Sequence, residues 1–304
     1  MEAIGRLRLV GAGKEPVALR RTLASHGVAM LAPQRIDLVH QVLESTLSVD
    51  SGAHTVRVRP GVRGTAAVVV EAETPPADPR TRRQLLAAVR RLLRLDQDLS
   101  PFYDLVSGDP ILGWSVAGAG RMLRSPTVFE DVVKTICTTN CTWSATIRMT
   151  DALVTELGAL APGGRRAFPT PAAMAAAGTD FYRQAARAGY RGAYLRALAT
   201  EVAEGRLDLE ALADPALPDD VVERRLLALP GVGPYAAAHV MLVSLGRYRR
   251  LVLDSWTRPT YAMLHGRAAS DSTIERRFRR YGRYAGLAFW LYLTRDWVED
   301  ERPE

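Results

Sequence analysis

The sequence predicts an α+β protein in which an antiparallel β-sheet domain with helices, residues 1–114, precedes an all-α domain, residues 115–304. Three observations support this division. Strand patterns dominate up to about residue 75, a proline-rich break follows at 74–79, and apolar residues recur with helical spacing from residue 80 onward. With 304 residues, 47% of them hydrophobic, the chain is long enough for two domains and can bury a sizeable core.

The first domain contains two stretches with the pattern of strands. Residues 54–59 alternate between polar and apolar side chains, and residues 65–72 include three consecutive valines. Turn-forming residues at 60–64 separate them and favour a hairpin. After the proline-rich break, one apolar stripe indicates a helix: Leu85, Leu86, Val89, Leu92 and Leu93.

The second domain is predicted to be helical throughout. Glycines at 163–164 and prolines within 169–171 mark loops between its helices, and we find no internal repeat. Apolar residues have helical spacing in seven ranges: 127–138, 144–158, 180–187, 191–203, 219–229, 234–245 and 274–293.

Residues 230–233 (Pro-Gly-Val-Gly) form a tight turn between two of these helices. Pro234 stands where a first helical residue belongs, because its missing N–H costs nothing there, and Gly246 supplies a stop signal. Such a turn leaves backbone N–H groups pointing outward at the positive end of a helix, which suits a phosphate oxygen. Taken alone, the turn is better explained as an ordinary helical hairpin.

The chain is basic, with 40 Lys and Arg against 33 Asp and Glu and a net charge of +7. This balance favours polyanionic partners, and a dense arginine run at 274–284 fits either a solvated helix face or a nucleic-acid surface. The two cysteines, Cys137 and Cys141, are too few for a structural zinc or an iron–sulfur cluster. No stretch has the pattern of a secretory signal or a membrane span, so we expect a reducing, cytoplasmic setting.

A solitary carboxylate, Asp254, follows the apolar residues 251–253 about twenty positions after the turn. Together with Leu229-Pro230-Gly231-Val232-Gly233 and Tyr235, it resembles the signature of the helix-hairpin-helix (HhH-GPD) DNA glycosylase superfamily. Three further segments are similar to the family: 129–141, 188–194 and 281–291. A sheet domain ahead of residue 115 resembles the longer members, the 3-methyladenine II and 8-oxoguanine DNA glycosylases.

The resemblance implies a role for each motif residue. The hairpin residues Leu229, Gly231, Val232 and Gly233 would hold a DNA phosphate, and a monovalent cation at the carbonyls of Leu229 and Val232 is compatible with the family. Asp254 would be the catalytic carboxylate, stabilising an oxocarbenium-like sugar and orienting water. A helix N-cap is its alternative role, compatible with the first, although Pro259 follows closely.

Tyr235 is a departure with consequences. Family members that also cleave the strand have a lysine at this place, whose amine forms a Schiff base with the sugar. A phenol cannot do so, and we therefore expect a monofunctional enzyme. Tyrosine here also resembles the thymine/uracil mismatch glycosylases, and simple packing beneath the hairpin is its structural alternative.

The remaining candidates lie near the motifs. His239, one turn after Tyr235, is predicted with Trp256 and Trp143 to line a base pocket, although each could equally be a core residue. Asn140 matches the asparagine that the 8-oxoguanine branch sends into the gap left by the flipped nucleotide. Cys141 and Thr142 depart from the asparagines that follow it in that branch.

The function predicted from these residues is hydrolytic excision of an alkylated base from double-stranded DNA by a monomer with no cofactor beyond the cation. Three alternatives stay open. They are a uracil/thymine mismatch glycosylase, a glycosylase for bulky modified bases used in self-resistance or phage defence, and a non-catalytic helix-hairpin-helix DNA-binding protein.

Overall fold

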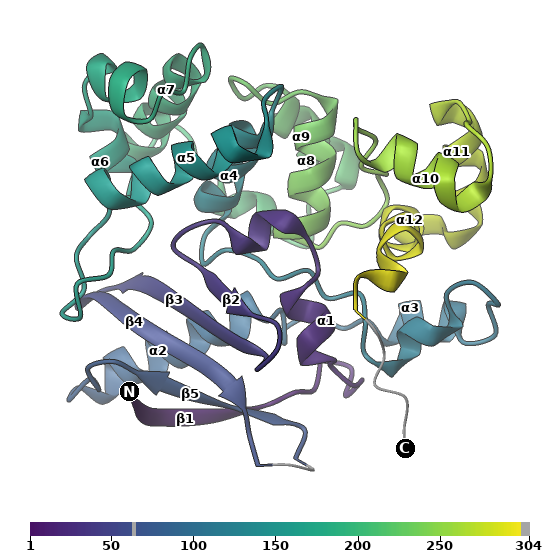
Figure 1. Cartoon of the computed structure of the whole chain (residues 1–304), viewed down its shortest axis with the longest axis horizontal. Coiled ribbons are helices and arrows are strands. Elements are labelled where there is room, and N and C mark those ends of the chain that lie inside the picture. The colour runs from purple at the N-terminus through teal and green to yellow at the C-terminus, as the bar shows by residue number, and fades with distance from the viewer. Residues whose placement is uncertain (63–64, 299–304) are drawn as a thin grey trace.

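A five-stranded antiparallel sheet forms one end of the molecule in the computed structural model, which describes residues 1–62 and 65–298 (Figure 1). The strand order is β1-β5-β4-β3-β2. The strands are β1 (Glu2–Arg8), β2 (Arg35–Asp37), β3 (Val42–Val49), β4 (Gly52–Pro60) and β5 (Ala67–Ala72). The predicted strands at 54–59 and 65–72 correspond to β4 and β5, and Arg63 and Gly64 of the predicted turn lie outside the described residues.

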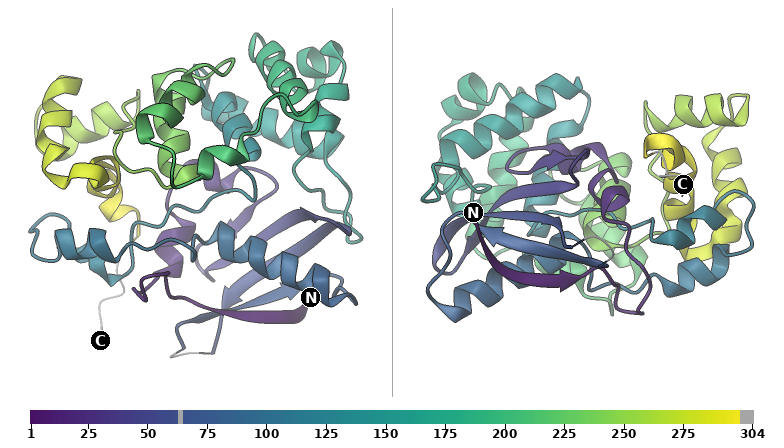
Figure 2. Two further views of the ribbon diagram at one scale, coloured as in Figure 1. Left: turned by 180° about the vertical axis from the view of Figure 1, so that it is seen from behind. Right: turned by 60° about the horizontal axis from the view of Figure 1, so that its bottom comes forward.

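One long helix, α2 (Pro79–Leu92), covers one face of this sheet (Figure 2). Asp78 caps it by accepting hydrogen bonds from the N–H groups of Arg80 and Thr81, at 3.0 and 3.1 Å. The predicted apolar stripe packs against the inward-facing valines of β4 and β5. Burial of these two apolar faces against each other makes the core of the sheet domain.

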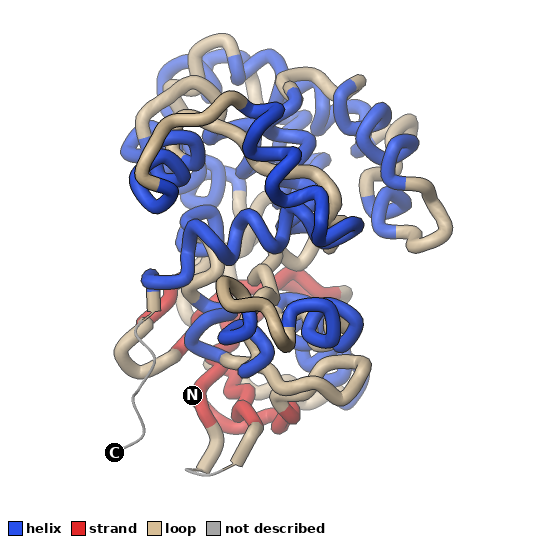
Figure 3. The backbone as a smooth tube through the Cα atoms, turned by 90° about the vertical axis from the view of Figure 1, so that its right-hand side faces the viewer, coloured by secondary structure: helices blue, strands red, loops and turns tan. Residues whose placement is uncertain are grey.

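The remaining elements are helices, most of which gather away from the sheet, while α1 packs on the core of the sheet domain through Leu19 and Leu23 (Figure 3). They are α1 (Leu19–Leu23), α3 (Ser100–Val106), α4 (Val128–Thr138), α5 (Trp143–Ala152), α6 (Pro171–Ala176), α7 (Arg191–Ala203), α8 (Asp219–Leu227), α9 (Pro234–Val240), α10 (Thr257–His265), α11 (Asp271–Phe278) and α12 (Ala285–Thr294). The predicted α+β fold class is confirmed. No helix within the described ranges has the length and apolar character needed to cross a bilayer.

Several predicted helices differ from the observed ones. The range 274–293 is not one helix, because Gly282 has φ +55° and ψ −124° and separates α11 from α12. The ranges 144–158 and 234–245 begin as α-helices, α5 and α9, and end in π-helical turns, η3 (Leu153–Leu157) and η6 (Met241–Leu245). The range 180–187 contains only the π-helical turn η4 (Phe181–Ala185).

The helical part has two apolar cores. One lies among α4, α5, α7, α8 and α9, and the other joins η6 to α10, α11 and α12. Leu99, Phe102 and Leu112 belong to the second core, so α3 packs with the C-terminal helices. This packing puts the change of domain near residue 98 rather than at the predicted residue 114.

Buried arginines tie the two domains together. Arg94 donates to the carbonyl of Met122 at 3.1 Å and to that of Ser244 at 3.2 Å. Arg121 donates to the carbonyl of Gln97 at 2.9 Å and pairs with Glu15. Because each guanidinium bonds backbone carbonyls in a buried interface, the sheet domain is held in a fixed position against the helices.

Candidate active site

The turn between α8 and α9 is the tight hairpin that the sequence predicts. Leu229 and Val232 are buried in the core beneath it, and the N–H of Val232 donates to the carbonyl of Leu229 at 3.2 Å. Pro234 opens α9, and no side chain caps this helix. The carbonyl of Leu229 keeps one lone pair, so a cation at this carbonyl and that of Val232 stays a prediction.

The two glycines of the turn have different reasons to be glycine. Gly231 has φ +78°, a left-handed conformation, and an added methyl group would lie 2.8 Å from Cδ2 of Tyr194. Gly233 has φ −98°, which any residue adopts, and a methyl group there would meet no atom within 4 Å. Gly231 therefore serves the fold, whereas Gly233 leaves open space in front of α9.

Asp254 ends the loop that leads from η6 to α10. Its Oδ1 accepts hydrogen bonds from the N–H of Trp256 at 2.9 Å and of Thr257 at 2.6 Å. The N–H of Asp254 in turn donates to Oγ1 of Thr257 at 2.8 Å, which makes a reciprocal capping box. Oδ2 accepts no hydrogen bond from any residue that the structure describes, so one carboxylate oxygen is fixed and the other is available.

Pro259 does not disturb this arrangement. It is the third residue of α10, where backbone N–H groups have no intrahelical partner. The N–H of Arg258 donates to the carbonyl of Asp254 at 3.3 Å and that of Thr260 to the carbonyl of Trp256 at 3.1 Å, so the turn on either side of the proline is intact.

The hairpin, Tyr235 and Asp254 line one cleft of about 580 Å³. Four segments contribute to it: the end of α4 with the loop that follows, the start of α7, the hairpin, and the loop before α10. The complete lining is Thr138, Thr139, Asn140, Cys141, Tyr190, Tyr194, Gly231, Gly233, Pro234, Tyr235, Ala236, Leu253, Asp254, Ser255 and Arg258.

Tyr235 is half-buried in the wall of this cleft. Its hydroxyl lies 3.1 Å from Oγ1 of Thr138 on α4. Burial raises the pKa of the phenol above its usual value, and the charge of Asp254 adds to the shift. The phenol is therefore neutral at physiological pH and stands close enough to Asp254 to feel its charge.

His239 lies one turn below Tyr235 and does not line the cleft. It is buried, and its ring centroid is 5.9 Å from those of Tyr235 and His26. Burial lowers the pKa of His239 to about 4, although the carboxylates of Asp131 and Asp254 act in the opposite direction. The imidazole of His239 is therefore neutral and lies beneath the wall of the cleft instead of lining it.

The two tryptophans predicted for the pocket also lie outside the cleft. Trp143 opens α5 and covers Gly27, where an added methyl group would lie 3.4 Å from the indole. Trp256 packs against Trp290 and Trp297 with tilted rings, at centroid distances of 5.7 and 5.3 Å. Trp143 and Trp256 are both partly exposed, at 45% and 38%.

Asn140 stands at the rim of the cleft. It has φ +47°, a conformation that asparagine tolerates better than most residues, and this turn ends the segment after α4. Its amide donates to the hydroxyl of Tyr190 at 3.4 Å. The residue is exposed, and its insertion into a duplex stays a prediction.

Two exposed tyrosines at the cleft were not among the predicted site residues. Tyr190 and Tyr194 pack edge to face at 5.9 Å, and the guanidinium of Arg191 lies 4.6 Å from the ring of Tyr190. Arg191 also bonds the carbonyl of Thr139 at 2.8 Å through Nε, which ties α7 to the loop of Asn140. Tyr190 and Tyr194 are four residues apart, and this helical spacing is the signal that could have placed both on one exposed face.

The arginine run at 274–284 lies on α11 and η7. Arg277 stands over the rings of Tyr261 and Tyr292, Arg280 over Tyr281 and Arg283 over Tyr284, at 4.8 to 5.9 Å. These arginines therefore cover largely buried tyrosine rings from the surface, and Arg280 is also paired with Asp109 at 3.0 Å.

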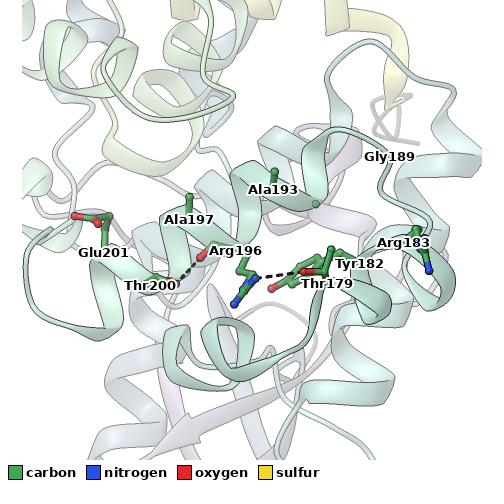
Figure 4. A pocket seen from close by; sticks show the side chains of 10 residues that line it. Thr179, Tyr182, Arg183, Gly189, Ala193, Arg196, Ala197, Thr200 and Glu201 are labelled. Carbon is green, nitrogen blue, oxygen red and sulfur yellow. Dashed lines mark hydrogen bonds between the residues drawn. The ribbon is translucent and has the colours of Figure 1, made fainter.

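A second hollow, of about 610 Å³, lies between η4 and the outer side of α7 (Figure 4). Its polar side chains bond within the protein: Arg196 donates to Thr179 at 3.3 Å, and Thr200 donates to the carbonyl of Arg196 at 2.9 Å. Glu201 is paired with Arg206 at 2.7 Å. Arg183 is paired with Asp180 at 2.9 Å, Tyr182 and small alanine and glycine residues form the rest, and we assign no chemistry to this hollow.

Comparison with known proteins identifies the fold. No family model matches the sequence, and no curated protein matches it. The structure superimposes on the 3-methyladenine DNA glycosylase from Archaeoglobus fulgidus with a TM-score of 0.74 and 21% identity, over 95% of this chain and 98% of that one. It matches the 8-oxoguanine glycosylase/lyase of Clostridium acetobutylicum in its apo form with a TM-score of 0.62 and 22% identity, over 82% and 87%. A complex of that enzyme with DNA containing cytosine opposite 8-oxoguanine gives 0.61, over 83% and 87%. The chain thus has the two-domain fold of the 3-methyladenine and 8-oxoguanine DNA glycosylases, as the resemblance in its motifs predicted.

Proposed function

We propose that this protein is a monofunctional DNA glycosylase, which turns a damaged nucleotide out of double-stranded DNA and hydrolyses its glycosidic bond. The observation that carries the proposal is the shared cleft, in which Asp254 and Tyr235 stand beside a glycine-rich hairpin. The fold adds support, because the proteins that share it are glycosylases that act on DNA.

The residues of the cleft suffice for hydrolysis. The open backbone at Gly233 holds a phosphate without reading sequence, and the turned-out nucleotide enters the cleft. As the bond from C1′ to the base nitrogen breaks, the free Oδ2 of Asp254 stabilises the positive charge on the sugar. A water oxygen then bonds to C1′ and passes its proton to Asp254, which leaves an abasic site and a free base.

The chain lacks an amine for strand cleavage at this site. It has two lysines, Lys14 and Lys134. Lys134 is buried on α4, where its ammonium pairs with Glu130 at 2.7 Å, and neither lysine lines the cleft. The phenol of Tyr235 stands where the lyases carry their lysine and forms no Schiff base. This departure from the pattern of the strand-cleaving family members supports the monofunctional part of the proposal.

The substrates we propose are N-alkylated bases, chiefly purines. An alkylated purine is positively charged and already activated to leave, so it needs no dedicated acid. The cleft offers it the carboxylate of Asp254 and the rings of Tyr235, Tyr190 and Tyr194. Cation–π contact contributes about 0.5–2 kcal/mol per ring.

The partner in this proposal is duplex DNA, bound by a monomer. Asn140 and the exposed ring of Tyr190 stand together at the rim and would fill the gap left by the turned-out nucleotide. The only cofactor that we propose is a monovalent cation at the carbonyls of Leu229 and Val232.

A panel of duplexes, each with one lesion, tests the proposal. Release of 3-methyladenine or 7-methylguanine should outpace release of uracil or thymine from mismatches, with abasic sites and no strand breaks before alkali. Borohydride should trap no covalent adduct. Faster release of uracil or thymine, or release of bulky adducts alone, overturns the alkylation assignment, and strand nicks overturn the monofunctional one. DNA binding without release of any base leaves only a binding module.

A further inference from the structure

The face of α4 that contacts α9 carries two threonines, Thr135 and Thr138, whose hydroxyl protons are donated within α4 itself. Oγ1 of Thr135 donates to the carbonyl of Asp131 at 2.7 Å, and Oγ1 of Thr138 donates to the carbonyl of Thr135 at 2.7 Å. Such bonds to the preceding turn are common for threonine inside helices. Since a hydroxyl has one proton, each threonine can offer only lone pairs to the side chains of α9.

This settles the direction of the hydrogen bond at Tyr235. Its hydroxyl lies 3.1 Å from Oγ1 of Thr138, and either oxygen could be the donor from distance alone. Because the Thr138 proton is held by a carbonyl at the shorter distance, the phenol proton points at Thr138. The phenol oxygen therefore turns its lone pairs away from α4, and both residues line the cleft.

The same arrangement recurs one turn deeper. Nδ1 of His239 lies 3.3 Å from Oγ1 of Thr135, whose proton is also committed. Nδ1 must then carry the imidazole proton, which leaves a lone pair on Nε2. The pKa of about 4, caused by burial, keeps this ring neutral and without a second donor. Tyr235 and His239, one turn apart on α9, thus each donate a proton to a threonine of α4. Each is left with lone pairs that can accept a hydrogen bond on its other side.

We propose that Thr138 is a specificity-determining positioning residue, which makes the hydroxyl of Tyr235 a hydrogen-bond acceptor and so selects bases that present an amino group to it. The inference rests on the proposed function and adds the polarity of the base to it. A carbonyl oxygen at the same place would face the lone pairs of the phenol oxygen without a proton between them. An amino group would meet the phenol oxygen as a donor.

Two lesions that differ by one amino group test this polarity. 7-Methylguanine and 7-methylhypoxanthine are both cationic leaving groups, and only the former has the 2-amino group. We would measure single-turnover release of each from the same duplex sequence. The wild type should favour 7-methylguanine by roughly tenfold, the effect of one well-placed hydrogen bond.

Three variants separate polarity from packing. Thr138→Ser keeps the hydroxyl and should keep the preference. Thr138→Val has nearly the same shape but frees the phenol proton, and its preference should fall to within about twofold. Tyr235→Phe removes the oxygen and should lose the preference as well, so the inference stays testable if one variant folds poorly. A melting temperature for each variant accompanies the rates.

The ratio of the two rates is the decisive readout, because a purely structural defect slows both lesions alike. An unchanged ratio in Thr138→Val or Tyr235→Phe overturns the inference, as does the absence of any preference in the wild type. If the wild type releases no lesion of the wider panel, the proposed glycosylase function fails instead.

Discussion

Replacing each hairpin glycine by alanine should separate the fold from DNA binding. At Gly233 the φ of −98° accepts alanine, and the new methyl group meets no protein atom within 4 Å. Restricting the unfolded chain stabilises by about 0.4–1 kcal/mol, and replacing a glycine N-cap by alanine costs roughly 0.5–1 kcal/mol, so the two effects nearly cancel. Gly233→Ala should therefore melt within about 2 °C of the wild type.

The same change at Gly231 is the matched control. There φ is +78°, and a methyl group would lie 2.8 Å from Tyr194. The left-handed conformation costs about 1–2 kcal/mol for alanine, and the partly exposed ring of Tyr194 can move aside. Gly231→Ala should lower the melting temperature by roughly 2–8 °C.

Although Gly233→Ala should leave the melting temperature almost unchanged, it should weaken DNA binding. Its methyl group would occupy the space in which a phosphate oxygen approaches the hairpin N–H groups. Loss of a hydrogen bond to a charged group costs about 1.5–3 kcal/mol, which is tenfold or more in affinity. Fluorescence anisotropy with a duplex carrying a tetrahydrofuran abasic-site analogue measures this effect. Affinity of Gly233→Ala equal to that of the wild type would refute phosphate binding by the hairpin.

Four further predictions concern the cleft and its surroundings. Asp254→Asn keeps the cap but removes the charge, so single-turnover release should fall by roughly 100-fold or more while anisotropy gives nearly unchanged affinity; near-normal rates would make the residue only a cap. Tyr235→Lys places an amine beside Asp254 and should create adducts that borohydride traps on gels, which the wild type lacks. Affinity for DNA should fall roughly tenfold or more between low and physiological salt, and a flat response would contradict phosphate anchoring. The folded-state pKa of His239, about 4, lies below its ordinary value of 6.5, so stability is lost as pH falls from about 6.5 towards 4. Between pH 7 and 5 this histidine should cost about 2 kcal/mol, and the difference in unfolding free energy between wild type and His239→Gln should show it in denaturant titrations.

The sequence revealed β4 through its alternation and β5 through its consecutive valines. β4 and β5 have apolar inward residues and were predicted. β3 was not, because Ser45 and Thr46 are both buried and the alternation is lost. Thr46 is buried on the far side of the strand, where its hydroxyl lies 3.1 Å from that of Thr55. β3 is therefore a strand because it pairs with β4 and β2 in the sheet, and its own sequence pattern does not indicate it.

The helical predictions failed where one residue changed the local conformation. An apolar pattern ran through 274–293, but Gly282 breaks it with a positive φ. α10 was not among the predicted helices, although Asp254 was considered as a helix N-cap, because Pro259 follows the cap so closely. The capping box of Asp254 and Thr257 shows that the proline lies in a first turn. Backbone caps of this kind depend on a few atoms and leave little trace in periodicity.

The candidate site was predictable as a set of motifs but not as a set of surfaces. The motifs identified the hairpin, Tyr235, Asn140 and Asp254, and the structure places them around one cleft. Spacing could not tell that the ring of Tyr235 covers His239, or that Trp256 turns to Trp290. Which side of a helix faces an opening is set by neighbours that are distant in sequence.

The capping role of Asp254 and its proposed catalytic role depend on the same hydrogen bonds. A carboxylate that must meet a developing positive charge is most effective when it does not move during the reaction. Oδ1 is held by two N–H groups at 2.9 and 2.6 Å, and this fixes the plane in which Oδ2 faces the cleft. The start of α10 thus supplies the rigidity that catalysis needs, at a position where the helix requires a cap in any case. Because an asparagine can make the same bonds, the catalytic charge is separable from the cap, and a loss of activity in a well-folded Asp254→Asn enzyme would report on the charge alone.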